Sequence, residues 1–395
     1  MIAQVNESAL QKYVQTMQDF GPRETGSDTC NAVGEYIYNE LATADLSVRY
    51  DSWFTKKWSG KNIEATLPGT GLSNGIVIVC AHYDGVSISP SADDNAGGVA
   101  IVLIIAKIMS RYSFNSTVKF VLFSGEEQGL LGSKDYARKA YERGDQIIGV
   151  INLDGVGGAP SAEDGKKIKY HVNNESAWMV DISEKVAHLY SDYMELEVIR
   201  LPQVKYSDHQ SFVDNGFDAS YFHQYAPYPY HHTSEDTIDH MNITYLTKIC
   251  RLTLVTLASV ACLDPMISDK DLKITVKGTV LSYPAQFSVK IENKKYEIDT
   301  ANVTINIQMK NLFTGEYVRG PYGIIYNWNF SEEIDDCWEF KAVVGVITRG
   351  LFKLEVSVKG FNDDVGLYAK QQTYGMIVKP IILIMPHKFL KNTIA

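Results

Sequence analysis

Short apolar runs alternate with amphipathic segments from residue 1 to about residue 264, and this alternation constrains the fold more than any other feature. Four runs rich in β-branched or aromatic residues are typical of buried parallel strands; they cover residues 76–82, 118–124, 147–154 and 218–223. Four amphipathic segments predict helices, at residues 96–111, 133–143, 175–192 and 245–262. Such alternation predicts an α/β fold with a mostly parallel central sheet and helices on both faces.

After Asp264-Pro265 the pattern changes to a period of two, punctuated by Gly, Asn and Pro. This pattern predicts a β-sandwich of about seven strands between residues 270 and 380. We therefore expect a first domain at residues 1–264, a β-sandwich accessory domain at 265–380 and a C-terminal tail at 381–395. Nothing in these strands decides whether the sandwich binds carbohydrate, a cell surface or a partner subunit, or only covers the first domain.

The charge of the chain excludes one class of partner. Of the net charge of −10, residues 1–264 contribute −12, from 33 acidic and 21 basic residues, and residues 265–395 contribute +2, from 14 and 16. The lysines and arginines form no runs of the kind that bind phosphate, so no nucleic-acid partner is expected. Cations and amine-bearing ligands suit the acidic first domain better.

No stretch reaches the ~18 uninterrupted apolar residues of a membrane span, so none is expected. The first residues lack the apolar core of a secretory signal, whereas six Asn-x-Ser/Thr sequons permit export. A secreted protein is slightly favoured if a signal peptide has been removed, and a cytoplasmic one otherwise.

The five cysteines form no CxxC pair and lie mostly among apolar residues. They predict buried hydrophobic side chains and no disulfide framework.

Side chains able to do chemistry follow the predicted strands. The carboxyl ends of parallel strands share one edge of a sheet, where ligands usually bind. The acidic and histidine residues expected at that edge are His82, Asp84, Asp93, Asp94, Glu126, Glu127, Asp154, His231 and His232. Each has an ordinary alternative when taken singly: His82 as a strand-end histidine, the two aspartates as helix caps, and the two glutamates as a solvated turn. Their coincidence on one edge favours a functional site.

Carboxylates gathered in this way repel one another and tend to protonate unless a cation is present, so the pattern indicates a metal site. Mixed imidazole and carboxylate ligands suit Zn²⁺, with Co²⁺ or Mn²⁺ as possible substitutes. Five ligands can hold two ions ~3.5–4 Å apart, the spacing of two-metal hydrolases, if one carboxylate among them binds both ions.

Six motifs stand in a fixed order along the chain: HYD at 82–84, ADDNAGG at 92–98, GEEQGLLGS at 125–133, NLD at 152–154, SDH at 207–209 and HTSEDT at 232–237. This order resembles that of the dizinc aminopeptidase family, which includes bacterial leucyl aminopeptidases, glutamate carboxypeptidases and glutaminyl cyclases. The resemblance covers residues 21–262 and is specific because six motifs agree. It implies the phosphorylase/hydrolase-like fold of zinc exopeptidases.

The resemblance also implies a ligand set of two Zn²⁺ per chain. Asp94 would bridge both ions, with His82 and Asp154 completing one site and Glu127 and His232 completing the other. Asp93 is the less favoured bridge, because the family ligand directly precedes the turn that begins here at Asn95.

Two neighbours of these ligands receive roles from the same resemblance. Glu126 would be the general base, free to take a proton from the attacking water and return it to the leaving amine. Asp84 would hydrogen-bond the imidazole of His82 and fix its tautomer. The peptide bond between Asp94 and Asn95 is often cis in the family, so a cis bond is expected here.

The sequence departs from the family pattern at the position before the last ligand. A tyrosine is common there and helps to stabilise the oxyanion, but this chain has His231. Tyr206 and His231 are therefore the candidate substrate or oxyanion donors, and a structural role for either is equally compatible with the sequence. The aromatic segment 221–230 is expected to line a pocket for bulky apolar N-terminal residues, unless it only packs as a long loop.

Together these features predict a metallo-aminopeptidase that acts on peptides with a free N-terminus. A carboxypeptidase or dipeptidase on the same centre is the first alternative; it would need cations for a terminal carboxylate, and Arg23, Arg200 and Lys205 are the candidates. A glutaminyl cyclase is less favoured, because the sequence after Asp94 is intact. A non-catalytic, receptor-like binding protein is the last alternative, because every expected ligand is present.

Overall fold

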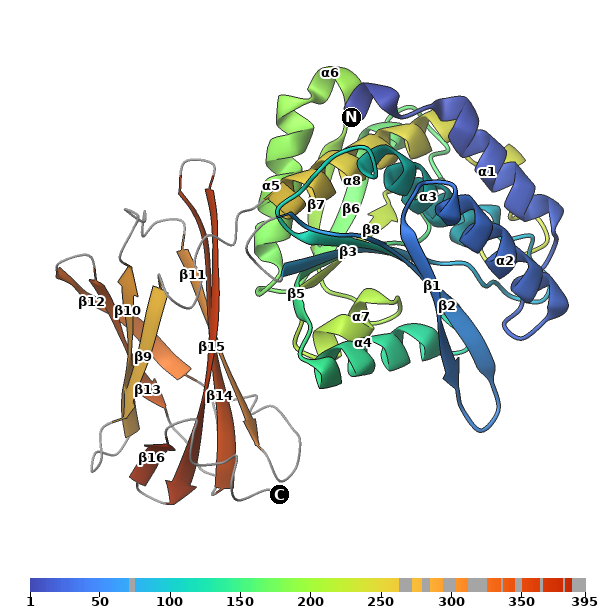
Figure 1. Cartoon of the computed structure of the whole chain (residues 1–395). Coiled ribbons are helices and arrows are strands. Elements are labelled where there is room, and N and C mark those ends of the chain that lie inside the picture. The colour runs from blue at the N-terminus through green and yellow to red at the C-terminus, as the bar shows by residue number, and fades with distance from the viewer. Residues whose placement is uncertain are drawn as a thin grey trace. The chain divides into compact units, whose positions relative to one another are not determined.

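The computed structural model describes residues 1–70 and 75–262 with their side chains, and beyond them the backbone of residues 272–278, 285–293, 303–311, 325–334, 337–344, 350–362, 365–378 and 381–385. The chain divides into two compact units, Met1–Cys262 and Leu263–Ala395, which are described separately. Figure 1 shows the helices and the mixed sheet of the first unit and the strands of the second.

The first unit is built on an eight-stranded sheet in the order β1-β2-β4-β3-β5-β8-β6-β7. Its strands are β1 (Ser47–Phe54), β2 (Ser59–Leu67), β3 (Gly75–His82), β4 (Thr117–Phe123), β5 (Gln146–Leu153), β6 (Lys167–Val172), β7 (Glu197–Pro202) and β8 (Ala219–Gln224). The central strands β4, β3, β5 and β8 are parallel, and they are the four strands that the sequence predicts. The mixed α/β class is confirmed.

The outer strands were not foreseen. β1 and β2 form an antiparallel hairpin that joins the edge of β4, and β6 runs antiparallel to β8 and parallel to β7. These strands lack the continuous apolar runs of the central ones; β1 has two buried residues and β7 has none. Their pairing depends on contacts with distant strands, which local pattern does not reveal.

Eight α-helices lie in this unit: α1 (Glu7–Asp19), α2 (Asp28–Ala42), α3 (Gly97–Met109), α4 (Leu131–Arg143), α5 (Ala177–Leu189), α6 (Ser191–Met194), α7 (His209–Asp214) and α8 (Ile243–Cys262). The helices predicted at 96–111, 133–143 and 245–262 are confirmed as α3, α4 and α8. The segment 175–192 forms α5 and then a separate short helix, because the chain leaves helical geometry at Tyr190. The sheet lies between helices on both faces, with α3 and α8 on one side and α4 and α7 on the other (Figure 1).

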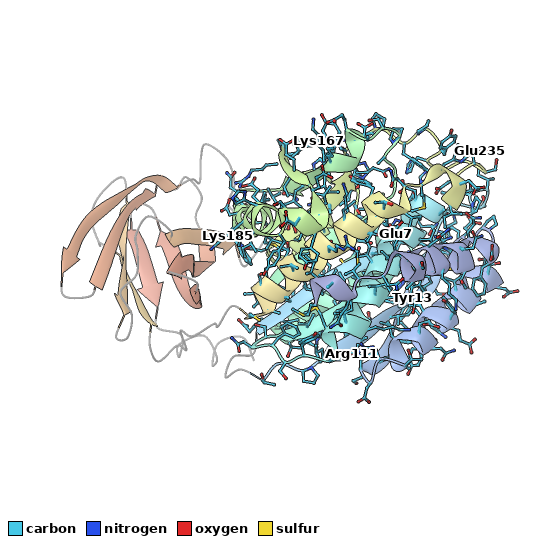
Figure 2. All side chains as sticks on the ribbon, turned by 90° about the horizontal axis from the view of Figure 1, so that it is seen from above. Glu7, Tyr13, Arg111, Lys167, Lys185 and Glu235 are labelled. Atoms are coloured by element: carbon cyan, nitrogen blue, oxygen red, sulfur yellow. The ribbon has the colours of Figure 1, made fainter. Side chains whose placement is uncertain are left out.

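The helix layer that contains α3 is closely connected. Twelve of the thirteen α3 residues are buried, and Lys107, the exception, donates to Glu40 on α2 and to Tyr13 on α1, both at 2.6 Å. Glu7 at the start of α1 accepts from Thr244 of α8 at 3.0 Å; Glu7 and Tyr13 are labelled in Figure 2. Two turns of α1 are thereby held to neighbouring helices.

α8 is the one helix of the described residues that is long and apolar enough to cross a membrane, yet 72% of its apolar window is buried within the unit. Such burial is typical of a core helix.

Three cysteines, Cys30, Cys80 and Cys250, are free and buried as expected, whereas Cys262 at the end of α8 is exposed, which corrects that part of the prediction.

The second unit contains two four-stranded antiparallel sheets, β12-β13-β10-β9 and β11-β14-β15-β16. Their strands are β9 (Leu272–Gly278), β10 (Ala285–Asn293), β11 (Val303–Asn311), β12 (Ile325–Ile334), β13 (Cys337–Val344), β14 (Gly350–Asn362), β15 (Val365–Val378) and β16 (Ile381–Met385). β16 pairs with β15, so the first five residues of the expected tail form a strand; residues 386–395 lie outside the described residues. The sandwich packing and the predicted domain roles stay predictions.

Candidate metal centre

His82, Asp94 and Asp154 meet at the carboxyl edge of the central strands. His82 is the last residue of β3, Asp154 directly follows β5, and Asp94 lies in the turn that precedes α3. Nε2 of His82 lies 3.1 Å from Oδ1 of Asp94 and 3.3 Å from Oδ1 of Asp154. Three segments far apart in sequence thus place one nitrogen and two carboxylate oxygens together.

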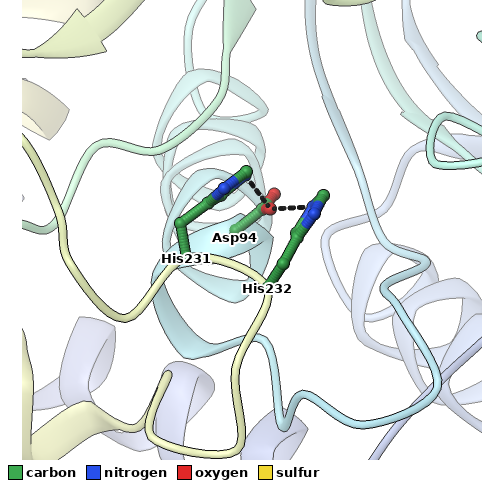
Figure 3. A group of neighbouring side chains, drawn as sticks. All are labelled: Asp94, His231 and His232. Carbon is green, nitrogen blue, oxygen red and sulfur yellow. Dashed lines mark ion pairs between the residues drawn. The ribbon is translucent and has the colours of Figure 1, made fainter.

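The second oxygen of Asp94 faces a different group. Its Oδ2 lies 3.0 Å from Nε2 of His231 and 3.1 Å from Nε2 of His232, as Figure 3 shows. Nε2 of His232 also lies 3.0 Å from both carboxylate oxygens of Glu127. Asp94 therefore stands between two donor groups, with one oxygen directed at each, which is the arrangement a bridging carboxylate requires.

The backbone around Asp94 contributes to this geometry. The peptide bond between Asp94 and Asn95 is cis, as the resemblance implied. The Asn95 side chain, and not either aspartate, caps the start of α3: its Oδ1 accepts from the backbone N–H of Gly98 at 3.1 Å. Its amide donates to the carbonyl oxygen of Leu153 at 2.7 Å, which connects this turn to the end of β5.

The donor set fits a divalent cation. Within each of the two groups, Asp94-His231-His232 and His82-Asp94-Asp154, the potential ligand atoms lie within 4.8 Å of one another. Burial, with Asp94 nearby, raises the pKa of Glu127 to about 7. Carboxyl groups held in this way lose their charge unless positive charge compensates them. Imidazole nitrogens mixed with carboxylate oxygens are typical Zn²⁺ ligands.

Hydrogen bonds couple the histidines and the carboxylates of this centre. Hydrogen bonding to Asp94 raises the pKa of His232 to about 9, although burial opposes this change. Burial would disfavour ionised Asp94, but hydrogen bonds from His231, His232 and His82 outweigh it and hold the pKa of Asp94 well below its usual value. Metal binding by these imidazoles would require their deprotonation, so a cation at this centre would displace the protons that the neighbouring carboxylates favour.

Asp84 connects His82 to the loop that contains Glu126 and Glu127. It is fully buried, and its carboxylate accepts from Thr25 Oγ1 at 2.8 Å and from the backbone N–H groups of Glu126 and Glu127 at 3.3 Å each. Its Oδ1 lies 3.7 Å from Nδ1 of His82, and its carbonyl oxygen is nearer, at 3.2 Å. Asp84 therefore orients His82 through its main chain and also holds the Glu126-Glu127 loop.

Ser207 and Asn152 hold the carboxylate of Asp154 in place. Both residues belong to the sequence motifs, but the sequence assigned them no role. Ser207 Oγ donates to Oδ2 of Asp154 at 2.6 Å, and the Asn152 amide donates to Ser207 Oγ at 2.7 Å. Oδ1 of Asp154 is left facing His82. The signal was present in the NLD and SDH motifs, but only the folded chain shows that the two motifs touch.

Asp93 does not face the centre. Its carboxylate accepts from the backbone N–H of Gly157 and from the amide of Gln224, both at 2.6 Å. Burial and the nearby Asp236 raise the pKa of Asp93 to about 8. Asp236 accepts in turn from the backbone N–H of Asp93 at 2.8 Å and of Asp94 at 3.2 Å. Asp93 and Asp236 thus hold the turn that presents Asp94.

The two candidate donors occupy different environments. His231 contacts Asp94 and stacks on His232, with 3.7 Å between ring centroids. The Tyr206 side chain is 72% exposed, although its neighbour Ser207 contacts Asp154. The structure therefore brings His231 to the centre and leaves Tyr206 at the surface beside it.

The aromatic segment 221–230 is only partly a loop. Tyr221 and Phe222 belong to β8 and are buried. Neither side chain therefore lines the expected substrate pocket. Tyr228 donates to Asp236 at 3.0 Å, and Tyr230 stacks on His240 with 3.8 Å between centroids. These tyrosines hold the loop that leads to His231 and His232.

Two of the three cations considered for a terminal carboxylate are occupied elsewhere. Arg23 is fully buried and donates to the carbonyl oxygens of Tyr83, Pro90 and Ser91 at 2.6–2.7 Å. Arg200 pairs with Asp181 and Glu184 at the surface. Arg23 and Arg200 thus already have partners, whereas Lys205 is exposed.

A family model described as Peptidase family M28 matches residues 62–257. A probable leucine aminopeptidase of Trichophyton verrucosum (strain HKI 0517) is 26% identical over 270 residues, 63% of this chain and 69% of that protein. Aminopeptidase YwaD of Bacillus subtilis (strain 168) is 31% identical over 196 residues, 48% of this chain and 42% of that protein.

Solved structures agree on the fold. An aminopeptidase from Aneurinibacillus sp. strain AM-1 superposes with a TM-score of 0.58 at 16% identity, covering 66% of this chain and 95% of that one. A zinc aminopeptidase of Bacillus subtilis, BSAP, superposes with a TM-score of 0.58 at 16% identity, covering 68% of this chain and 97% of that one. The matched family segment lies within the first unit.

Proposed function

Residues 62–257 of this chain belong to peptidase family M28, and from this premise we propose that the protein is a zinc-dependent aminopeptidase acting on peptides with a free N-terminus. One observation carries the proposal: the two oxygens of Asp94 face two separate donor groups at the carboxyl edge of the sheet. The names of the matched relatives, which include several leucine aminopeptidases, support the same activity.

We assign the ligands of two zinc ions as follows. Asp94 would be shared, His82 and Asp154 would complete one site, and Glu127 and His232 the other. Bound zinc supplies a polarised substrate carbonyl and a water that is nucleophilic at neutral pH. The residues described below determine how that chemistry is directed.

Glu126 is suited to proton transfer. Its backbone N–H donates to Asp84. Among the described residues its carboxylate forms no hydrogen bond or ion pair, whereas the carboxylate of Glu127 contacts His232. Burial, together with Asp154, Asp208 and Asp84, raises the pKa of Glu126 well above its usual value. We propose that the Glu126 carboxylate accepts a proton from the attacking water and returns it to the leaving amine.

His231 is the stronger candidate to stabilise the developing oxyanion. Its ring is adjacent to Asp94 and His232, and a ring nitrogen can donate a hydrogen bond where the carbonyl oxygen acquires charge. Tyr206, exposed at the surface, suits a contact with the substrate further from the reacting bond.

The charge of the first domain favours recognition of an amine. The domain has a net charge of −12, and because zinc would offset Asp94, Glu127 and Asp154, the acidic residues outside the ligand set would attract the ammonium group. A carboxypeptidase needs a cation for the terminal carboxylate instead; Arg23 and Arg200 already have partners, and of the three candidates Lys205 is left. Binding of an α-ammonium group beside the metal centre would confine cleavage to the first residue of the peptide.

The proposal is tested by blocking each end of a peptide in turn. With an unblocked N-terminal leucine, we expect residue release whether the C-terminus is free or amidated, none after N-terminal acetylation, and none after chelation of the metal. Release that requires a free C-terminus would indicate a carboxypeptidase. No turnover of any substrate by zinc-loaded protein would favour the binding-protein alternative.

A further inference from the structure

The β1–β2 hairpin extends past the edge of the sheet at which the candidate metal centre lies. Pairing between β2 and β4 ends at Ile63 and Leu122, one residue before β4 itself ends. Beyond this point Ser59–Lys61 still pairs with Ser52–Phe54. Three residues at ~3.4 Å each carry the hairpin ~10 Å past the end of β4 before the turn at 55–58. Figure 1 shows the far end of the hairpin standing clear of the helices.

The base of this extension is fixed to the loop that contains Glu126. Trp53 Nε1 donates to Ser124 Oγ at 3.0 Å, and its ring lies so close to Gly125 that a Cβ there would be 2.6 Å from Cζ2. Ser124 Oγ donates to the carbonyl oxygen of Lys61 at 3.2 Å. The hairpin therefore stands directly beside the residues that precede Glu126.

The turn of the hairpin lies near the segment that contains Thr25 and Gly26. Cε3 of Trp58 lies 4.0 Å from the Cβ position of Gly26. The residue before Gly26 is Thr25, which donates to Asp84, the carboxylate behind the metal centre. The hydrogen bond of Trp53 therefore fixes the base of the hairpin beside the centre, and its turn lies near the segment that contains Thr25.

The hairpin tip, defined as residues 54–61, has a surface unlike the rest of the unit. Phe54 is 85% exposed, and Lys56, Lys57 and Lys61 are exposed. Residues 52–63 contain these three lysines and no acidic residue, within a domain of net charge −12. Among the described residues Lys56 has no ion-pair partner, and Lys57 lies over the Trp58 ring at 4.7 Å. Lys61 lies over the Tyr50 ring at 5.0 Å, so no carboxylate of the described residues neutralises the lysines of the tip. An exposed aromatic ring beside such cations suits a ligand that is apolar along its length and carries a carboxylate.

We propose that the hairpin tip binds the part of a peptide substrate that follows the cleaved bond and favours peptides with a carboxylate there. This inference rests on the proposed function, because Glu126 would return a proton to the leaving amine and so lies beside the residue after the cleaved bond. A peptide extends by ~3.3–3.6 Å per residue, so about three residues span the ~10 Å of the hairpin extension. The carboxylate is either an acidic side chain at that distance or the C-terminus of a short peptide.

The experiment compares kcat/KM on matched substrates of the full-length zinc-loaded protein. Leucyl nitroanilide has no residue after the cleaved bond and reports the metal centre alone. Leu-Gly-Gly-Glu amide and Leu-Gly-Gly-Gln amide differ in the side-chain carboxylate, and Leu-Gly-Gly-Gln with a free C-terminus tests the terminal one. We expect about threefold to tenfold higher kcat/KM for a carboxylate-bearing peptide at low salt, decreasing as salt is added.

Three variants decide the matter. The double variant Lys56→Glu with Lys57→Glu should reverse the preference for carboxylate-bearing peptides, and Phe54→Ala should lower kcat/KM for all peptides by about threefold or more. Neither should change turnover of leucyl nitroanilide. The control, Lys12→Glu with Lys185→Glu, changes the net charge equally at two exposed lysines on α1 and α5 and should leave the peptide preference unchanged.

An unchanged peptide preference in the hairpin variants, or an equal change in the control, would overturn the inference and leave the proposed function intact. Equal losses on the nitroanilide and on the peptides would also overturn the inference, because the hairpin would then support the centre and not the substrate. Absence of nitroanilide and peptide turnover in the unaltered protein would instead contradict the proposed function, and the inference would fall with it.

Discussion

Asp94 is the residue on which the proposed centre depends, because one of its oxygens faces His82 and the other faces His232. Its neighbour Asp93 has the same side chain but contacts Gly157 and Gln224. The motif order distinguished the two aspartates, and the geometry agrees with that choice. The supporting residues Thr25, Asn152 and Ser207 were not predicted, since their roles depend on contacts with side chains 53 to 59 positions away.

The adjacent glutamates give the first prediction. Glu126→Gln should bind zinc as the unaltered protein does but lose about 10²–10⁴-fold in kcat, because the amide cannot accept the proton. Glu127→Gln should lower the zinc content, since it removes a proposed ligand. Zinc analysis and steady-state kinetics on the same samples check both. Full turnover by Glu126→Gln would exclude it as the base.

Ser207 gives the second prediction. Ser207→Ala removes the hydroxyl that holds Oδ2 of Asp154 and should weaken zinc binding by about 10–100-fold, as loss of such support generally does. Competition with a chelator of known affinity measures the change. Ser183→Ala, which also removes a buried hydrogen-bonded hydroxyl but on α5, serves as the control. Equal zinc affinity in both variants would show that Ser207 is not needed to orient the ligand.

Among the elements, the four central strands and the helices α3, α4 and α8 were predictable because their apolar patterns are continuous. The β1–β2 hairpin was not, because only two of the eight β1 residues are buried, the sequence of the hairpin shows no continuous apolar run, and its partner β4 lies more than fifty residues away. What secures it is Glu64 of β2. Its carboxylate accepts from Arg49 of β1 at 2.8 Å and from Tyr136 of α4 at 2.6 Å, and Lys119 of β4 lies 3.5 Å away.

This network gives a prediction about stability and pH. Burial alone would raise the pKa of Glu64, but hydrogen bonding from Arg49 and the charge of Lys119 lower it from 4.5 to about 2. The stabilisation is present above pH ~4.5 and is lost as the pH falls toward 2, because the folded state then must take up the proton. At ~1.4 kcal/mol per pH unit this amounts to about 3 kcal/mol.

Glu64→Gln should therefore lower the free energy of unfolding at pH 7 by about 3 kcal/mol, and its difference from the unaltered protein should shrink between pH 4.5 and 2. Urea unfolding across this range measures it. Glu197→Gln, at an exposed position on β7, should show no such pH-dependent difference. A difference between Glu64→Gln and the unaltered protein that persists unchanged at pH 2 would contradict the assigned cause.

At the scale of the whole molecule, the acidic charge lies entirely in the residues of the first domain, and residues 265–395 are near neutral. The sequence predicted the boundary between the two domains because its pattern changes at residue 264. Before that residue apolar strands alternate with amphipathic helices, and after it apolar and polar residues alternate one by one. The sequence did not predict what the second unit does, since alternating strands bring no recognisable group of reactive side chains together. The proposed chemistry therefore rests on the first unit, whereas the measurement below uses the full chain.

The central claim is that zinc held by this donor set enables release of N-terminal residues. It is tested most directly by titrating zinc into metal-free, full-length protein while measuring both bound zinc and leucine release from a peptide with a free N-terminus. The account predicts no release without metal and full release as binding approaches two zinc ions per chain. Leucine release by the metal-free protein, or saturation below one bound zinc per chain without activity, would contradict it.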